Sequence, residues 1–467
     1  MPLFHIKDKK SVNMRKVLIG VAAFLTLSFA ACQQQRPDGL VLTNVTLIDG
    51  TGKTPRSGIS VVILEDRFET VGKTEKIEIP RKAAVVDAAG KYLIPGLWDM
   101  HVHFYAGGAD LAPLFIANGV TSVRDMGGDL VQMEKMCQRI EAGMLIGPRI
   151  KMPGPMLESA RWITMVEKLL HKPLLPKRVG VEKPEEAEEK VNAVAAMGVD
   201  FIKIRTCASK DTYYAILKAA QNAGLPVVGH LPMIMTLAEV SDAGQRSIEH
   251  NFFTNLNKMS EEERERLIAK LKKNDTAFVP TLAADHSRSI PMEETKAVLN
   301  DRNGELDYRR PYLPKDLLDF WEESISLEKY MGNIDWKKLF QTGHLFLRDL
   351  HQSGVKIMAG TDLGVPLVYP GFSLHDELHH LVEKVGMTPM EALVSATRLP
   401  AEFMGMGDSL GTVEEGKIAD LVLLDANPLE DITNTLKISA VIVGGILYEQ
   451  AELQTILDTA RQNARKH

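Results

Sequence analysis

Short apolar runs recur along the whole chain, but their spacing differs between its ends and its middle. Near both ends the runs are rich in Val, Ile and Thr and are separated by Gly and Asp, which is typical of short strands joined by turns. These runs are Leu40–Ile48, Ile59–Leu64, Phe68–Val71 and Ala83–Asp87, and later Leu410–Val413, Ala419–Leu424 and Ala440–Tyr448. We predict that the first four form a small antiparallel sheet. We also predict that the two groups meet as one composite β domain of residues 40–93 and 406–450.

Between these groups, eight strand-like runs alternate with amphipathic segments such as Pro184–Met197 and Asp211–Ala223. The eight runs are Leu97–His103, Thr121–Asp125, Arg149–Pro153, Phe201–Thr206, Pro226–His230, Ser247–His250, Phe278–Leu282 and Lys356–Thr361. Strands that alternate with helices predict an α/β fold with parallel strands. A doubly wound open sheet would share this pattern, but the presence of eight runs favours a (β/α)8 TIM barrel over residues 94–405.

Two long segments interrupt the barrel pattern. Leu157–Lys183 lies between the third and fourth predicted strands, and His286–Trp336 separates the seventh strand from the helix before the eighth. Long insertions at a barrel mouth serve as lids or specificity loops, or else as helical packing appendages, and the sequence leaves both open. The last stretch, residues 451–467, is predicted to be a polar helix or a frayed tail.

The first part of the chain predicts export. Several Lys and Arg residues precede an apolar run from Val17 to Ala31, and small residues lead up to Cys32. Such a pattern predicts a signal peptide over residues 1–31. The cysteine after two alanines resembles the lipobox of bacterial lipoproteins. The resemblance implies lipidation of Cys32, a polar tether over residues 32–39, and membrane contact through the lipid anchor alone, at the periplasmic face or at the outer membrane and cell surface. A plain secreted protein cut near Ala31 is the alternative.

Composition and charge narrow the classes of partner. The chain has 467 residues, of which 45% are hydrophobic and 25% charged, an ordinary globular composition. Its 55 Lys and Arg against 61 Asp and Glu give a net charge of −6, so there is no basic field suited to nucleic acid. We expect a small-molecule substrate and no nucleic acid, with a homo-oligomer left open. Beyond Cys32 only Cys137 and Cys207 remain, and whether they pair stays open.

Residues that commonly bind metals end several of the predicted barrel strands. His101 and His103 are two positions apart in the first strand and therefore face the same side. His230, His250 and Asp362 end the fifth, sixth and eighth strands. Each alone would more often be an ordinary hydrogen-bonded residue. Because the carboxyl ends of barrel strands meet at one face, the five together predict a metal site there.

Two further charged residues lie in the predicted fourth strand. Lys203 has apolar neighbours, so an unpaired ammonium there would be costly and its pKa would fall. It either pairs with a barrel carboxylate such as Asp125 or is a neutral amine that reacts with carbon dioxide to give a carbamate. Arg205 should share its face, where it would bind a substrate carboxylate or phosphate or form a barrel salt bridge. Tyr105 and His286 are further candidates near the mouth.

The ordered set of motifs resembles the metal-binding set of the amidohydrolase superfamily, in particular its imidazolonepropionase-like and prolidase-like members. These motifs are His101-x-His103, Lys203, Gly229-His230, Glu249-His250 and Gly360-Thr361-Asp362, with a C-terminal signature at Leu410–Leu421 and Asn427-Pro428-Leu429. The resemblance implies a binuclear centre with two divalent ions, zinc being the expected metal. It implies that His101, His103 and Asp362 bind the more buried ion, that His230 and His250 bind the second, and that carboxylated Lys203 bridges the two.

The same resemblance implies a mechanism and a reaction. A metal-bridging hydroxide would attack the substrate, and Asp362 would accept the water proton and later donate one to the leaving group. We expect cleavage of amide bonds in dipeptides or N-acyl amino acids. The alternatives are lactones, cyclic amides such as imidazolones, or phosphotriesters at the same centre, or a lipoprotein that binds a ligand without turnover. Many prolidase-like relatives carry a Gly-Gly-His loop after strand three, whereas Met156–Trp162 has no such histidine, so dipeptide specificity is not transferred.

Overall fold

The computed structural model describes residues 39–104, 107–174, 177–250, 259–328 and 334–466. The predicted signal peptide, Cys32 and Tyr105 lie outside these ranges. Within them, no helix combines the length and the apolar character needed to cross a bilayer.

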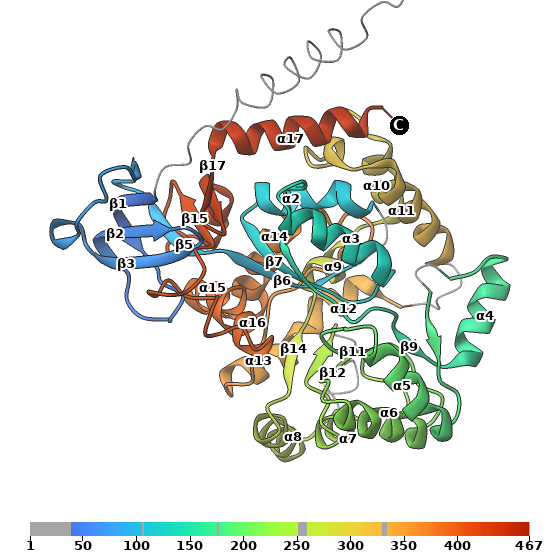
Figure 1. The fold of residues 1–467 in the computed structure, drawn as a ribbon. Helices are drawn as coiled ribbons and strands as arrows, with labels where there is room; N and C mark the ends of the chain where they lie inside the picture. Colours follow the sequence, from blue (N-terminus) through green and yellow to red (C-terminus); the bar gives the residue numbers. More distant parts are fainter. Residues whose placement is uncertain (1–38, 105–106, 175–176, 251–258, 329–333, 467) are drawn as a thin grey trace, which may run out of the picture.

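Strands from both ends of the described chain form one sheet, at the left of Figure 1. They are β1 (Leu40–Leu47), β2 (Arg56–Leu64), β3 (Arg67–Lys73), β4 (Ala84–Asp87), β5 (Tyr92–Pro95), β15 (Leu421–Leu424), β16 (Ile438–Val443) and β17 (Ile446–Glu449). Their order is β17-β16-β15-β5-β1-β2-β3, with β4 paired to β1. β5 joins the two halves, because it pairs in parallel with β1 and antiparallel with β15. The predicted composite sheet is therefore observed, over a core that includes Leu42, Val61 and Leu423.

Three details of the predicted sheet are wrong. The sheet is mixed rather than antiparallel, because β4 and β5 both return parallel to β1 after the β2–β3 hairpin. Leu410–Val413 is a turn rather than a strand, and the Val413 amide donates to the Asp49 carbonyl. The run Ala440–Tyr448 is a hairpin rather than one strand, because Gly444 and Gly445 adopt φ of 54° and 75°, a left-handed conformation that turns the chain.

Seven parallel strands form most of the barrel. They are β6 (Leu97–Val102), β7 (Val120–Asp125), β8 (Arg149–Lys151), β11 (Ile202–Ile204), β12 (Val227–Gly229), β13 (Ser247–Glu249) and β14 (Ala277–Val279). β6, β7 and β8 form one ladder, and β11 to β14 form another. The Asp200 amide donates to the Met152 carbonyl at 2.9 Å and so links the two. The α/β barrel predicted from the alternating pattern is confirmed.

The predicted eighth strand, Lys356–Thr361, closes the barrel without forming a regular strand. Ile357 makes a single bridge to Phe278 of β14, and the Met100 amide of β6 donates to the Ala359 carbonyl at 3.0 Å. The carbonyl oxygens of Ser395 and Ala396, at the end of α15 (Pro389–Ser395), accept the amides of Ala359 and Trp98. These bonds from a helix terminus interrupt the ladder, so the expected strand is a correctly placed segment with irregular pairing.

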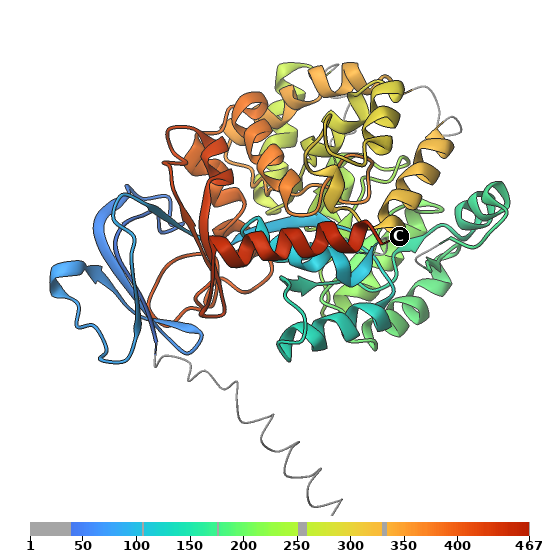
Figure 2. The same cartoon turned by 90° about the horizontal axis from the view of Figure 1, so that it is seen from above.

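Helices surround the barrel strands (Figures 1 and 2). They include α2 (Ala112–Ala117), α3 (Leu130–Glu141), α5 (Ala187–Ala195), α6 (Lys210–Asn222), α7 (Leu237–Asp242), α8 (Glu261–Lys273), α13 (His344–Gln352), α14 (Phe372–His380) and α16 (Arg398–Phe403). α6 shows why such segments are helical: the Ser209 hydroxyl caps its first turn by accepting from the Thr212 amide, and Tyr213, Ile216 and Ala220 face the core.

The C-terminal residues form α17 (Gln450–Ala464), so the helix is the observed one of the two predicted states. Its Leu453 and Ile456 are buried in one cluster with Ile116 of α2 and Val441 of β16. This packing holds the helix along the barrel and next to the composite sheet (Figure 2).

The two insertions differ in structure. The first contains β9 (Leu157–Glu158), α4 (Ala160–Leu170) and β10 (Val179–Gly180). Because β9 pairs with β11 and β10 pairs with β9, it extends the barrel ladder, while α4 lies at the outer edge (Figure 1). The second is helical, with α9 (Leu282–Ser289), α10 (Met292–Asn300) and α11 (Lys315–Glu328), followed by α12 (Trp336–Thr342), which packs against α9.

Candidate metal centre

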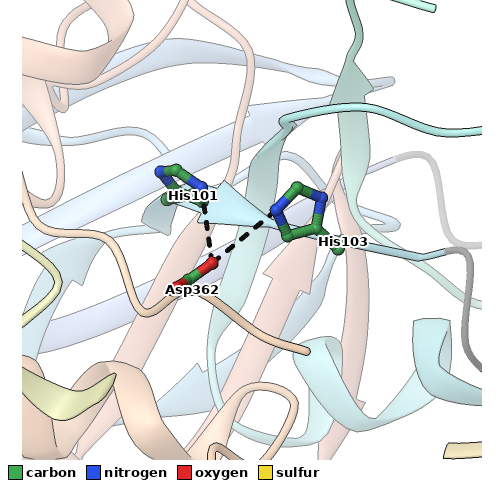
Figure 3. A group of neighbouring side chains, drawn as sticks. All are labelled: His101, His103 and Asp362. Carbon is green, nitrogen blue, oxygen red and sulfur yellow. Dashed lines mark ion pairs between the residues drawn. The ribbon is translucent and has the colours of Figure 1, made fainter. Parts of the chain in front are cut away.

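Three of the predicted ligands meet at one end of the barrel (Figure 3). His101 is the fifth residue of β6, His103 follows that strand, and Asp362 follows the irregular eighth segment. Their candidate ligand atoms all lie within 4.8 Å of one another, and all three residues are buried. Asp362 Oδ1 lies 3.5 Å from His101 Nε2 and 3.6 Å from His103 Nε2. The Asp362 amide donates to the His101 carbonyl, which ties the two strand ends together.

Two further histidines lie beside this group. His230 follows β12 and His250 follows β13, and their Nε2 atoms are 3.2 Å apart. His250 Nδ1 lies 2.9 Å from the Thr281 hydroxyl and 3.7 Å from Asp362 Oδ2. His250 and Asp362 both have positive φ, 67° and 61°, a conformation that non-glycine residues adopt at a cost. The chain therefore turns sharply at two of the strand ends that present side chains to the site.

Lys203 in β11 is almost fully buried, and its Nζ has no hydrogen-bond partner among the described residues. Burial lowers its pKa from 10.5 to about 7, although the charge of Glu249 opposes this shift. The alternative that paired Lys203 with Asp125 is not realised. The Asp125 carboxylate instead accepts from the backbone amides of Phe104 and Gly127, each at 2.9 Å. A buried amine with this pKa is partly neutral near pH 7, which carbamate formation requires.

A pair of charged residues that our sequence interpretation did not assign holds His101. Glu249 Oε2 accepts from His101 Nδ1 at 2.9 Å, and Arg124 Nη2 donates to both Glu249 oxygens at 2.8 Å. All three side chains are fully buried. The bond fixes the proton on Nδ1 and leaves Nε2 of His101 with a free lone pair toward Asp362. The available signal was a charged residue inside each of two predicted strands, Arg124 in Thr121–Asp125 and Glu249 in Ser247–His250.

Burial also sets the charge of the imidazoles. It lowers the pKa of His103 to about 4 and that of His250 to about 3, and it holds the pKa values of His101 and His230 well below 6.5. Burial alone would raise the pKa of Asp362, but the surrounding histidines and Arg288, whose Nη2 lies 3.3 Å from Oδ2, hold it below its usual range. Near pH 7 the site therefore presents neutral imidazoles and an ionised carboxylate, the forms that bind metals.

Other predicted candidates occupy different places. Arg205 donates to Glu158 Oε1 at 2.8 Å, so the salt bridge that was one of its two predicted roles is present. The His286 ring packs against Phe340 and His380. Cys137 and Cys207 are both free thiols.

Changing Glu249 to glutamine tests the support of His101. We expect metal affinity to fall about 10- to 100-fold, the usual effect of losing a hydrogen-bond partner of a metal-binding histidine. Stability should fall by about 3–5 kcal/mol, because Arg124 is left buried without its counter-charge. Chelator competition and thermal unfolding of the metal-free protein measure the two effects separately. An unchanged metal affinity in a destabilised protein would restrict Glu249 to a structural role.

The family model of the amidohydrolase family matches residues 92–447. The chain belongs to this family. Among curated relatives, ochratoxinase from Aspergillus niger is 24% identical over 441 residues, which cover 83% of this chain and 81% of the relative. Imidazolonepropionase from Thermoplasma volcanium is 39% identical over 90 residues, but these cover only 18% of this chain and 22% of the relative. The predicted resemblance to the amidohydrolase superfamily is confirmed.

Solved structures agree with this assignment to the amidohydrolases. A putative prolidase from Bifidobacterium longum is 25% identical, with a TM-score of 0.69 and coverage of 91% of this chain and 99% of that one. A Xaa-Pro dipeptidase with bound methionine in its active site is also 25% identical, with a TM-score of 0.68 and coverage of 88% and 100%. The likeness includes the composite sheet as well as the barrel, since it spans nearly the whole described chain.

Proposed function

We propose that this chain is a binuclear, metal-dependent amidohydrolase that cleaves carbon–nitrogen bonds in small substrates such as dipeptides and N-acyl amino acids. The observation that carries the proposal is the group of His101, His103 and Asp362 at one end of the barrel, with His250 and His230 beside it and the buried Lys203 in β11. The prolidase and dipeptidase neighbours support a carbon–nitrogen bond as the target.

The residues present fit a pair of divalent ions. Among the described side chains, His101 Nε2 and Lys203 Nζ are buried polar atoms without a hydrogen-bond partner, which is costly unless something binds there. Imidazole and carboxylate donors suit zinc. His101, His103 and Asp362 would hold one ion. His230 and His250 would hold the second ion. Lys203, as its carbamate, would be a ligand of both ions.

Bound divalent ions would lower the pKa of a water molecule toward neutrality and polarise the carbonyl of the substrate. The chain supplies the proton transfers. Asp362 is ionised near pH 7 and lies at the centre of the ligand group, so one of its oxygens can accept the proton of the attacking water and later donate it to the leaving amine. Glu249 and Thr281 keep His101 and His250 oriented while this happens.

The pKa of Lys203 predicts how the centre assembles. An amine must be neutral to react with carbon dioxide, and with a pKa of about 7 this lysine is mostly protonated below that pH and mostly neutral above it. Reconstitution of metal-free protein is therefore expected to be faster at pH 8 than at pH 6, and faster with added bicarbonate. The measurement is metal uptake in degassed and bicarbonate-supplemented buffers. A rate of metal uptake that depends on neither pH nor bicarbonate would contradict carbamate formation on Lys203.

A hydrolysis screen tests the proposed reaction. Protein that begins after Cys32, loaded with zinc, is incubated with dipeptides and N-acyl amino acids, and products are detected by mass spectrometry against a chelator-treated control. Chelator-sensitive amide cleavage is the expected result. Cleavage confined to lactones, imidazolones or phosphotriesters would contradict the amide specificity. Ligand binding that persists in Asp362→Asn, without turnover in either form, would indicate a binding protein.

We also propose that the protein is exported and anchored through a lipid on Cys32. The support is the basic, apolar and small-residue pattern that precedes this cysteine. Cys32→Ser is expected to shift the exported protein from the membrane fraction to the soluble fraction, because the acyl chains attach to the sulfur of Cys32. Fractionation with immunoblotting measures this. An unchanged distribution of the protein between the two fractions would contradict the lipid anchor and leave the proposal of export standing.

A further inference from the structure

The two oxygens of the Asp362 carboxylate face different partners. Oδ1 lies 3.5 Å from His101 Nε2 and 3.6 Å from His103 Nε2, on the side of these two candidate ligands (Figure 3). Oδ2 lies 3.3 Å from Arg288 Nη2, which donates a hydrogen bond to it. His250 Nδ1 is farther from Oδ2, at 3.7 Å. The carboxylate is therefore oriented with one oxygen toward the two histidines and the other toward the arginine.

Arg288 lies in the last turn of α9, and two hydrogen bonds hold this helix beside the site. The backbone amide of the second residue of α9 donates to Glu377 Oε2 of α14 at 2.7 Å. The Ser287 hydroxyl, one residue before Arg288, donates to the carbonyl of Pro366, which is four residues beyond Asp362. The turn that carries Arg288 is thus bonded to the same segment that carries Asp362, so the distance between the two side chains is fixed from both ends.

The Arg288 guanidinium is also held by an aromatic ring. The ring of Trp336, the first residue of α12, lies with its centroid 4.9 Å from Cζ of Arg288. A cation over an aromatic face is attracted to the ring. Because α12 packs against α9, both partners of this contact belong to elements that are fixed to each other. The Arg288 side chain is 19% exposed and that of Asp362 9%, so the bond between them is largely shielded from water.

Stability alone does not account for this arginine. A buried ion pair is weak evidence for stability, because the cost of desolvation offsets the attraction. Nη1 of Arg288 is buried and has no hydrogen-bond partner among the described residues, which adds to that cost. Asp285, three residues earlier on α9, also has two buried oxygens without such a partner, yet Arg288 donates to Asp362. The arrangement favours a role at Asp362 over a role in stability.

We propose that Arg288 is a positioning residue that holds the Asp362 carboxylate in one orientation, with Oδ1 toward the histidine ligands and Oδ2 as the atom that transfers the proton. The O–H bond of the attacking water breaks as Oδ2–H forms, and Oδ2–H breaks as the leaving amine gains N–H and the C–N bond is cleaved. Arg288 gains and loses no proton, because it donates to one lone pair of Oδ2 while the other handles the transfer. This inference rests on the proposed amide hydrolysis, in which it assigns the proton transfers to one oxygen.

The kinetic test combines Arg288→Gln with two leaving groups on the same acyl group. One substrate is an amide, whose nitrogen must gain a proton as it leaves, and the other is a p-nitrophenyl ester, whose phenolate leaves without one. In the zinc-loaded enzyme, the change is expected to lower kcat for the amide about 10- to 100-fold, the effect of displacing a catalytic group by about 1 Å. The loss for the ester should be at least about fivefold smaller, because it needs no general acid. KM and metal content should stay within about twofold, because substrate and metal binding are unchanged.

Two further variants separate positioning from folding. Arg288→Ala leaves a gap between Asp362 and Trp336, so millimolar guanidinium should restore part of the kcat, whereas urea, which is uncharged, should not. Arg264→Gln is the matched control. Arg264 of α8 also donates to an aspartate, Asp349 of α13, at 2.7 Å, and neither residue is among the proposed ligands. Its loss should leave kcat and KM for both substrates unchanged.

Crystal structures of the zinc-loaded parent and of Arg288→Gln provide a readout that needs no turnover. In the parent, Oδ2 of Asp362 should accept a hydrogen bond from Arg288. In the variant, the carboxylate should rotate or occupy more than one orientation, because the donor that fixes Oδ2 is gone. The melting temperatures of both proteins are measured on the same samples to show that the variant is folded.

The outcomes separate the two proposals. An unchanged Asp362 orientation in Arg288→Gln would overturn the positioning role and leave amide hydrolysis standing. Equal losses of kcat for amide and ester without recovery in guanidinium, or a loss of kcat that follows a loss of metal, would do the same. A parent enzyme that cleaves no amide, with an Asp362 orientation that depends on Arg288, would overturn the proposed reaction and keep the positioning of Asp362. The absence of both amide cleavage and this dependence would overturn both.

Discussion

Asp362→Asn is expected to lower kcat about 1,000-fold while the chain still folds. Asparagine keeps the size of the side chain but neither accepts a proton nor carries the negative charge, so both the proton transfer and one metal contact are lost. General acid and base catalysis alone accounts for about 100- to 10,000-fold in enzymes. The fall in kcat is measured by steady-state kinetics, and the metal content is measured on the same sample.

The control for this variant is Asp376→Asn. Asp376 also pairs with an arginine, Arg309, at 2.6 Å, but it is not among the ligand residues. Its loss should leave kcat within about twofold of the parent enzyme. Retention of more than a tenth of the activity in Asp362→Asn, with full metal content, would remove Asp362 from the proton transfers.

Lys203→Ala is expected to weaken metal binding at least about 100-fold, which exceeds the effect of losing an outer hydrogen-bond partner. The change removes a ligand that, as a carbamate, would carry a negative charge between the two ions. It also leaves a cavity in the barrel, into which a small carboxylate such as acetate should fit. Acetate is therefore expected to restore part of the activity and of the metal content of this variant.

Lys203→Arg is the contrasting variant for the carbamate. A guanidinium stays protonated in proteins and forms no carbamate, so this variant should lose the metals and should not respond to acetate. Full metal content in both Lys203 variants would show that this residue contributes packing alone.

The sequence predicted the barrel because its signal is local. Strands such as β12 and β14 are short apolar runs, and a helix such as α6 has its own cap at Ser209 and an apolar face that includes Tyr213. The proposed set of ligand residues could also be chosen from the sequence. His101 and His103 share a strand face, and the others end later strands whose carboxyl ends the barrel brings together.

Features that depend on distant partners could not be predicted. The eighth segment lacks a regular ladder with β6 because the Ser395 carbonyl accepts from Ala359 of the segment and the Ala396 carbonyl accepts from Trp98 of β6. No local pattern indicates these contacts. The support of His101 by Glu249 joins residues 148 positions apart. Glu158 likewise meets Arg178 and Arg205 only because the first insertion adds two strands to the barrel ladder.

The number of metal ions that restores activity decides whether the centre is binuclear. Metal-free protein is titrated with zinc in the presence of bicarbonate, and bound metal and amide hydrolysis are measured at each step. The proposed centre predicts that activity is absent without metal and reaches its maximum near two ions per chain. Full activity without metal, or a maximum at one ion per chain, would contradict a binuclear centre built from these six residues.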